Sequence, residues 1–528
     1  MLAALSLASL AVLPWYHNLL SHISLPEGFE LSVYTEILSV RNLAVSPSGQ
    51  LFASSWDWGL AKNNHHKKQH TPVYATRRTA EGTVEPWPIT EAADCHNAVT
   101  FLDGDLYTME RSRLWRHRNI EALPFGRKSK PELLVGTAEP FDSGKSPIGS
   151  SGNGIPFYDW HGQKYIAADL VRKKLYTVFS SPCNVPGNGM EFPSTGISDC
   201  HDRKQHPYIG VLVEFNVTGQ QMSVVAEGIR SSGGVKVHPQ SGDVWFSDNG
   251  RDEWGGSGAV SYAPGVSDSM PPGELNRLGI PSSVPGRTGI GNVPHYGFPF
   301  CYGHGIPDPA SSTLGFKLNP SMSCDKYHGA VVEFPAHGAA MGFTFYDHPG
   351  AFPDVYQGAP FVALHGSWDA SIPTGYSVAW TPFQSDNKSP LGAAEEFISF
   401  RLEPPVACKI SDDCPGNSTC QDRSPAAQFD LIKYCGGRGR PTDIAMLPSG
   451  ELLISDQLNS LVYKIEYTGK RPDCVTTYGK GCAAPSIGKS MAGLTTELGT
   501  RYIGFIVLLG AGAFVLLVTR LRRVPAVI

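Results

Sequence analysis

Six times along the chain, a short apolar run is followed by a tight turn and then by a second run rich in β-branched and aromatic residues. Short runs of this kind, bounded by glycine, proline and aspartate, are typical of β-strands rather than helices. Successive pairs of runs begin about 55 to 110 residues apart, which suits four-stranded blades joined by loops of uneven length. The pairs are 43–49 with 51–55, 98–101 with 106–109, 165–167 with 175–178, 235–238 with 244–246, 342–346 with 361–364, and 443–446 with 452–455.

This repetition predicts an all-β fold, a six-bladed β-propeller over residues 23–468. The composition agrees, because 57 Gly and 42 Pro indicate many turns. A net charge of -5, with acidic and basic residues interspersed, provides no basic face for nucleic acid.

Both ends of the chain predict export and a membrane anchor. The apolar run 2–13 predicts a signal peptide over residues 1–22, with an uncleaved anchor as the alternative. Residues 502–519 contain no charge and are long enough for a transmembrane helix, and three arginines lie in the tail 520–528 that follows. By the positive-inside rule, this tail is cytoplasmic and the propeller extracellular, joined by a stalk at 469–501. We therefore expect a single-pass type I protein of the cell membrane.

The cysteines favour disulfides over metal sites. Eleven cysteines include no Cys-x2-Cys spacing, and this pattern indicates an oxidising compartment. Two acceptable glycosylation sequons begin at Asn216 and Asn417. An insertion at 405–437 holds four cysteines whose connectivity the sequence leaves open. The candidate sets are Cys183 with Cys200, Cys301 with Cys324, Cys474 with Cys482, and the group Cys408, Cys414, Cys420 and Cys435, with Cys95 left over.

A basic residue stands shortly before the first strand of every unit. In a propeller this position opens onto the central channel, so six blades bring these side chains together around one opening. Such a concentration of donors and cations suits an anionic, planar ligand. The alternative is a set of solvated loop residues. The six are Arg41, His96, His161, Arg230, His337 and Arg440.

Three motifs carry a resemblance to a known family. They are Gly-Ile-Arg-Ser-Ser-Gly-Gly at 228–234, Asp-Val-Trp-Phe-Ser-Asp-Asn-Gly-Arg-Asp at 243–252, and Pro-Pro-Gly-Glu-Leu-Asn at 271–276. In this order they resemble the soluble quinoprotein glucose/sorbosone dehydrogenase family, the PQQ-dependent sugar or pyranose dehydrogenases. The resemblance extends over residues 25–467. It implies a pyrroloquinoline quinone (PQQ) cofactor and Ca²⁺ at the channel opening.

The resemblance also implies roles for individual residues. His161 matches the general base, a role that suits an imidazole near neutral pH. Arg230 matches the cation beside the reacting carbonyl, with Ser231 next to it at the cofactor. The backbone carbonyls of Gly250 and Arg251 match calcium ligands. The residues that match positions near the cofactor's carboxylates are His337, His365 and Arg440.

These features predict oxidation of a sugar at the cell surface by hydride transfer to the quinone. Because no Cys-x-x-Cys-His haem motif is present, a separate electron acceptor, a cytochrome or small quinone, is expected. Two alternatives remain open: a calcium-dependent lactonase on the same fold, and a non-catalytic cell-surface binding ectodomain. The second is favoured by departures from the family pattern at 231–232, Trp160 and 369–370. The His-rich tract 65–70 is expected to be solvated.

Overall fold

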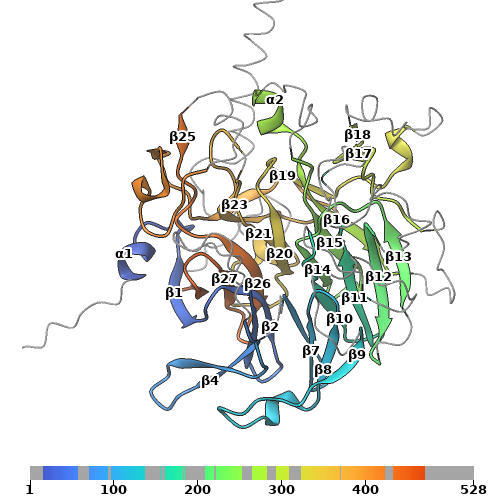
Figure 1. The fold of residues 1–528 in the computed structure, drawn as a ribbon, viewed down its shortest axis with the longest axis vertical. Helices are drawn as coiled ribbons and strands as arrows, with labels where there is room; N and C mark the ends of the chain where they lie inside the picture. The colour runs from blue at the N-terminus through green and yellow to red at the C-terminus, as the bar shows by residue number, and fades with distance from the viewer. Residues whose placement is uncertain are drawn as a thin grey trace, which may run out of the picture.

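The computed structural model describes residues 16–56, 71–92, 97–136, 155, 161–181, 184, 209–218, 222–252, 264–281, 293–308, 323–368, 370–421 and 432–469. Regular structure in these ranges is mainly antiparallel β-strand, arranged as blades around an axis (Figure 1). The helical segments in these ranges are short. They are α1 (Tyr16–Leu20), α2 (Pro264–Ser269), and the 3₁₀ turns η1 (Ile120–Ala122), η3 (Cys324–Lys326), η4 (Asp354–Tyr356) and η5 (Ser411–Asp413).

Six four-stranded sheets form the blades, each numbered from its innermost strand outwards. Blade 1 contains β2 (Val40–Val45), β3 (Leu51–Ser55), β4 (Tyr74–Arg78) and β5 (Val84–Pro88). Blade 2 contains β6 (Ala98–Leu102), β7 (Asp105–Met109), β8 (Leu114–His117) and β9 (Glu132–Val135). Blade 3 contains β10 (Ile166–Asp169), β11 (Lys174–Phe179), β12 (Val211–Asn216) and β13 (Ser223–Glu227).

The second half of the chain repeats this arrangement. Blade 4 contains β14 (Gly234–Val237), β15 (Val244–Asp248), β16 (Gly273–Gly279) and β19 (Val332–Phe334). Blade 5 contains β20 (Ala340–Phe345), β21 (Pro360–Leu364), β22 (Ser377–Trp380) and β23 (Glu395–Ser399). Blade 6 contains β26 (Pro441–Met446), β27 (Leu452–Asp456), β28 (Leu461–Tyr467) and β1 (Phe29–Glu36). Two-stranded sheets join β17 (Cys301–Tyr302) to β18 (Ile306–Pro307) and β24 (Ala407–Cys408) to β25 (Lys433–Tyr434).

The blades close into a ring. Each innermost strand contacts the innermost strand of the next blade, and β26 of the last blade contacts β2 of the first. The N-terminal strand β1 is the outer strand of blade 6, paired antiparallel with β28, and Figure 1 shows it in blue beside the orange strands β26 and β27. The predicted six-bladed propeller is therefore confirmed, and each predicted pair of runs falls on the two inner strands of one blade.

Burial explains why the sequence pattern predicted the two inner strands of each blade. The second strands β3, β7, β15, β21 and β27 are buried along their whole length because they lie between neighbouring blades. Outer strands are only partly buried, and β5 contains Pro86 and Pro88, which an edge strand tolerates. The turn Asp103–Gly104 between β6 and β7 has positive φ at both residues, as a two-residue hairpin of this twist requires.

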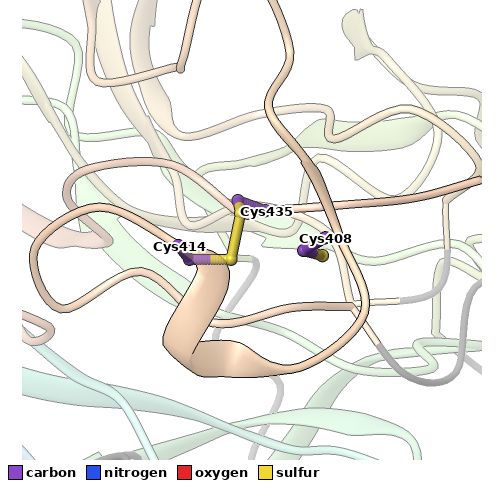
Figure 2. Close-up of side chains that lie close together, drawn as sticks. All are labelled: Cys408, Cys414 and Cys435. Atoms are coloured by element: carbon purple, nitrogen blue, oxygen red, sulfur yellow. A yellow bond between two sulfur atoms is a disulfide. The ribbon is translucent and has the colours of Figure 1, made fainter.

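Three disulfides lie among the described residues. Cys301–Cys324 confirms one predicted pairing, with Cα atoms 5.8 Å apart. In the insertion the pairs are Cys408–Cys420 and Cys414–Cys435, a connectivity that the sequence did not determine. Figure 2 shows Cys408 close to the Cys414–Cys435 bond. Because all these sulfur atoms are in disulfides, the cluster is not a metal site.

Several predictions fall outside the described residues. They concern residues 1–15 of the predicted signal peptide, the His-rich tract 65–70, most of the predicted stalk, the predicted helix 502–519 and the tail. They also concern Cys95, His96, Cys183 and Cys200. Among the residues that are described, no helix is both long and apolar enough to span a bilayer. Residues 16–20 form α1, whose Leu19 and Leu20 pack against the core.

Phe29 tests the closure of the ring. Its ring contacts those of Phe352, Tyr356, Phe397 and Tyr467, with centroids 4.8 to 5.5 Å apart. Phe29→Ala is therefore expected to lower the free energy of unfolding by about 3–5 kcal/mol in a urea titration. The control is Val171→Ala, because Val171 is an exposed loop residue. This change should alter the free energy of unfolding by less than about 0.5 kcal/mol. Comparable losses in both variants would contradict this account.

Candidate functional site

The residues predicted for the site lie on two kinds of connection. One kind joins the outer strand of a blade to the innermost strand of the next; the other joins the second and third strands of one blade. Because neighbouring strands are antiparallel, both kinds lie at the same edge of the sheet, as Gly234 opposite Ser247 illustrates. All eight residues are therefore at one end of the channel, which we call the mouth. The first kind carries His161, Arg230, Ser231, His337 and Arg440; the second carries Gly250, Arg251 and His365.

Arg230 is a buried cation surrounded by oxygen atoms. Its Nη2 donates to Asn184 Oδ1 at 2.7 Å and to a carboxylate oxygen of Asp252 at 3.0 Å. Nη1 donates to the carbonyl oxygen of Asn249 at 3.2 Å. With three neighbouring groups accepting hydrogen bonds, the planar guanidinium is held in one orientation.

The carboxylate of Asp248 holds the backbone that carries Arg230. It accepts from the amide N–H of Arg230 at 2.9 Å and from that of Ser231 at 2.6 Å. Burial raises the pKa of Asp248 to about 6, against the lowering effect of these two amides. Asp248 therefore fixes where Arg230 and Ser231 enter the mouth.

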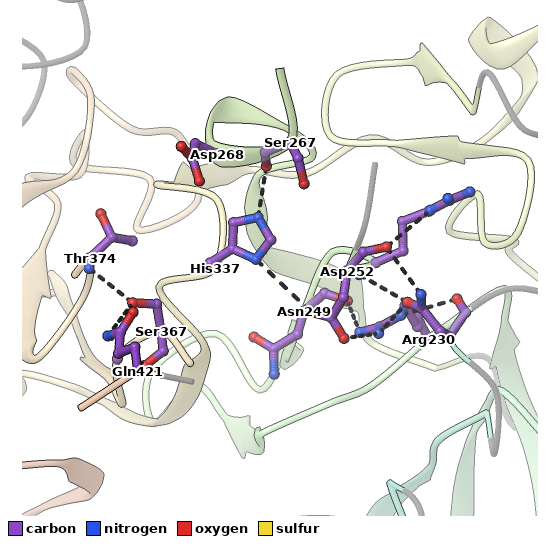
Figure 3. A network of polar contacts seen from close by, with 12 residues as sticks. Arg230, Asn249, Asp252, Ser267, Asp268, His337, Ser367, Thr374 and Gln421 are labelled. Carbon is purple, nitrogen blue, oxygen red and sulfur yellow. Dashed lines mark hydrogen bonds and ion pairs between the residues drawn. The ribbon is translucent and has the colours of Figure 1, made fainter. Parts of the chain in front are cut away.

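Asp252 also links Arg230 to His337, as Figure 3 shows. His337 Nδ1 lies 4.0 Å from a carboxylate oxygen of Asp252, and Nε2 donates to the carbonyl oxygen of Ser267 at 2.7 Å. Asp268, beside Ser267 on α2, accepts from the backbone N–H of Ser371 at 2.8 Å. This network connects the mouth loops of blades 4 and 5.

Arg440 and His365 form the opposite part of the network. Arg440 donates to the carbonyl oxygens of Gly366 at 2.9 Å and of His365 at 3.3 Å. Its amide N–H donates to Asp456 at 2.9 Å, the same arrangement as Arg230 with Asp248. Burial, together with the positive charges of Arg440 and Arg41, lowers the pKa of His365 well below its usual value. His365 is therefore neutral at pH 7.

Arg41 connects the two parts across the mouth. It belongs to blade 1, yet its Nη2 donates to the hydroxyl of Tyr165 in front of blade 3 at 3.1 Å. Its Nη1 donates to Gln457 at 2.7 Å, and its buried Nε makes no hydrogen bond among the described residues. The described contacts of Arg41 include no carboxylate, so a positive charge is concentrated here.

His161 lies on the blade 3 side of the mouth. Its Nδ1 donates to the carbonyl oxygen of Ser181 at 2.7 Å, which places the lone pair of the neutral imidazole on Nε2. Burial of the ring and the charge of Arg230 lower the pKa of His161 to about 3. The backbone φ is 51° at His161 and 59° at His337, a region that few residues other than glycine adopt. Such conformations cluster at functional sites.

The turn at Gly250 and Arg251 is rich in oxygen atoms. A Cβ at Gly250 would lie 2.9 Å from the carbonyl oxygens of both Pro271 and Pro272, so only glycine allows this approach. The neighbouring Asn249 Oδ1 is buried and accepts no hydrogen bond from the described residues. Carbonyl and amide oxygens are ligands that Ca²⁺ prefers. The turn therefore fits a calcium ion, and Asn249 is a candidate ligand that sequence analysis missed.

The side chain of Arg251 has a separate, structural contact. Its Nη1 lies 3.0 Å and 3.1 Å from the two carboxylate oxygens of Asp308, and both side chains are fully buried. The sequence did not predict this ion pair, because the two residues lie 57 positions apart.

Sequence analysis also missed the two carboxylates that hold the arginines. Asp248 and Asp456 each end the second strand of a blade in the pattern Ser-Asp followed by an amide side chain, at 247–249 and 455–457. Asp456 accepts additionally from Asn459 at 2.6 Å and from the Tyr463 hydroxyl at 2.8 Å. Comparison of the blades with one another could have identified this repeat.

Known proteins share both the fold and part of the sequence. A family model described as TrAA12-like matches residues 204–430. An uncharacterized protein of Borreliella burgdorferi is 25% identical over 308 residues, which is 58% of this chain and 61% of that protein. The match therefore spans less than two thirds of that relative's length.

Two solved proteins have the same propeller fold. The holo form of the pyranose dehydrogenase PQQ domain from Coprinopsis cinerea has a TM-score of 0.57 at 15% identity, over 84% of this chain and 97% of that one. A carbohydrate-active enzyme of family AA12 from Trichoderma reesei has TM-scores of 0.55 in its iodide structure and 0.53 in its calcium structure. Identity is 15% and 14%, with the same coverage.

The chain thus has the six-bladed propeller fold of these solved proteins, with a basic mouth. The resemblance to PQQ-dependent sugar dehydrogenases that the motifs indicated is confirmed, since the family match includes all three motifs. The roles of the individual site residues stay predictions.

The Arg251–Asp308 pair can be tested through stability. Asp308→Asn leaves a buried guanidinium without its counter-charge, so the free energy of unfolding should fall by about 3–5 kcal/mol in urea. The control is Glu85→Gln, which breaks the half-exposed Arg77–Glu85 pair and should cost at most about 1 kcal/mol. A double substitution, Arg251→Met with Asp308→Leu, should recover most of the loss. If it were no more stable than Asp308→Asn, the ion pair would not explain the effect.

The pKa of His161 predicts a pH-dependent stability of the cofactor-free protein. In the unfolded chain His161 gains a proton below its ordinary pKa of 6.5, whereas the folded protein resists protonation down to about 3. Stability from this group is thus present above pH 6.5 and is lost as the pH falls, by about 3 kcal/mol at pH 4.5. His161→Gln should therefore be more stable relative to wild type at pH 4.5 than at pH 7. An unchanged difference in urea titrations at the two pH values would contradict the shifted pKa.

Proposed function

We propose that the protein is a PQQ- and calcium-dependent sugar dehydrogenase of the cell surface, with an aldose, pyranose or sorbosone-like substrate. The observation that carries the proposal is the convergence of Arg41, Arg230 and Arg440 with three histidines at one mouth of the propeller. PQQ is a planar tricarboxylate, and guanidinium groups are the best partners for carboxylates. The pyranose dehydrogenase domain of similar fold is named for its PQQ.

The residues at the mouth fit both groups. Arg440 would hold a carboxylate of PQQ, with His337 and His365 near the cofactor and Ser231 and Arg230 beside its reacting end. The carbonyls of Gly250 and Arg251, with Asn249 Oδ1, would hold Ca²⁺. Arg41 Nε and Asn249 Oδ1 are buried and have no hydrogen-bond partner among the described residues, so they are a donor and an acceptor that such ligands would satisfy.

When bound, PQQ supplies a carbonyl carbon that accepts hydride from the sugar, and Ca²⁺ polarises this carbonyl. His161 accepts the proton of the sugar hydroxyl at Nε2, because Nδ1 carries the hydrogen donated to Ser181. Arg230 places a fixed positive charge beside the oxygen on which negative charge develops. Asp252 orients Arg230 and so keeps this charge in place.

We further propose an outward-facing enzyme that is anchored through the helix 502–519. A separate cytochrome or small quinone would serve as the electron acceptor. The expected export and the three disulfides support an extracellular location.

Addition of PQQ and Ca²⁺ to the purified protein tests the function. We expect a bound-quinone absorbance that requires Ca²⁺ and bleaches when aldoses or pyranoses are added. In stopped-flow measurements, His161→Ala should bleach about 10²–10⁴-fold more slowly and bind the quinone as tightly as wild type. The matched control is His304→Ala, because His304 is an exposed histidine paired with Glu333.

Other outcomes would identify the alternatives. Absence of quinone binding would overturn the proposal and favour a binding ectodomain. Hydrolysis of a sugar lactone with Ca²⁺ alone would favour a lactonase. Bleaching by His161→Ala at the wild-type rate would remove His161 as the base.

A further inference from the structure

The insertion between blades 5 and 6 is a compact unit that lies next to the mouth. It lies between β23 and Arg440 and contains β24, η5 and β25. Its two disulfides cluster with Leu402 and Val406 in a small apolar core of their own. We call residues 406–421 and 432–436 the disulfide module. Sequence analysis left it as an insertion without an assigned role.

One side chain of the module reaches the mouth loop of blade 5. Gln421 is only 6% exposed, and its Nε2 lies 3.0 Å from the Tyr376 hydroxyl. The same nitrogen lies 3.2 Å from both the carbonyl oxygen and the Oγ of Ser367. Figure 3 shows Gln421 against Ser367, beside Thr374. The module is thus hydrogen-bonded to both ends of the loop 367–376.

The same loop holds Arg440. Gly366, next to Ser367, accepts a hydrogen bond from Arg440 Nη2, and the guanidinium carbon lies 5.7 Å from the centre of the Tyr376 ring. A Cβ at Gly366 would come within 2.4 Å of the Tyr376 ring, so the two ends of the loop are in close contact. A shift of Ser367 or Tyr376 therefore moves the atoms that orient Arg440.

We propose that Gln421 is a positioning residue, through which the disulfide module holds the blade 5 loop in the conformation that orients Arg440. The disulfide Cys408–Cys420 fixes the residue next to Gln421, so the covalent framework sets the position of the amide. The expected effect of Gln421 on the affinity for PQQ rests on the proposed function. The expected effect of Gln421 on the conformation of the blade 5 loop is independent of that function.

Hydrogen exchange of the full-length, cofactor-free protein tests the positioning directly. Gln421→Met keeps the length of the side chain and removes its hydrogen-bonding groups. Amides in 366–376 should then exchange on the order of tenfold faster than in wild type. The control is Asp413→Asn. The carboxylate of Asp413 accepts hydrogen bonds only from the nearby amides of Lys409 and Ile410 in the described contacts, so this change should leave the segment 366–376 unaltered.

Gln421→Glu distinguishes loss of the hydrogen bonds from general misfolding, because its effect on the exchange rate should depend on pH. A protonated carboxyl group donates to the Ser367 carbonyl, whereas an ionised one only accepts and is repelled. Exchange of 366–376, relative to wild type at the same pH, should be near normal at pH 5 and accelerated at pH 8, because burial raises a carboxyl pKa. Gln421→Met should show no such recovery at pH 5.

Quinone binding separates this inference from the proposed function. With PQQ and Ca²⁺ as the probe, Gln421→Met should raise the Kd about tenfold and change the rate of hydride transfer less. If wild type binds no quinone while exchange responds as expected, the proposed function fails and the positioning role stands. Wild-type exchange in Gln421→Met, or an equal acceleration in Asp413→Asn, would overturn the positioning role.

Discussion

The antiparallel pairing of β1 with β28 joins the two ends of the propeller, and the geometry of the mouth depends on it. Residues near both ends of the chain meet there: Arg41 follows β1, whereas Arg440 and Asp456 belong to blade 6. The contact between β26 and β2 then completes the ring, and Asp443 of β26 bonds to the backbone of Leu43 at 2.9 Å. Closure of the ring is what brings Arg41 and Arg440 to the same mouth.

The mouth concentrates positive charge in a buried place, which is unfavourable without compensation. Two devices supply it. Carboxylates at strand ends, Asp248 and Asp456, hold the backbones of Arg230 and Arg440, so that the charged groups are placed rigidly. His161 and His365 remain neutral at pH 7, because burial and the arginine charges lower the pKa of both. A bound polyanion would complete the compensation, which is the electrostatic reason for the proposed cofactor.

The disulfide module adds a second layer of support to this arrangement. The loop between β21 and β22 of blade 5 begins with His365 and Gly366, whose carbonyl oxygens accept hydrogen bonds from Arg440. Gln421 supplies hydrogen bonds from a neighbouring unit that is fixed covalently. A small segment without a sizeable core is commonly stabilised by disulfides. The proposed role of Gln421 would make the orientation of Arg440 depend on a residue outside the mouth loops.

The sequence by itself determined the blade number, because strands buried on both faces leave continuous apolar runs such as 51–55 and 361–364. Through the family motifs it also indicated His161, Arg230 and Arg440. The outer strands were less visible, since β5 and β9 are only partly buried. Only the tertiary structure decided the partners: Arg251 with Asp308, Arg41 with Tyr165, and Gln421 with Ser367. The members of these pairs are 57, 124 and 54 positions apart, and a contact between segments so far apart in the chain leaves no local pattern in the sequence.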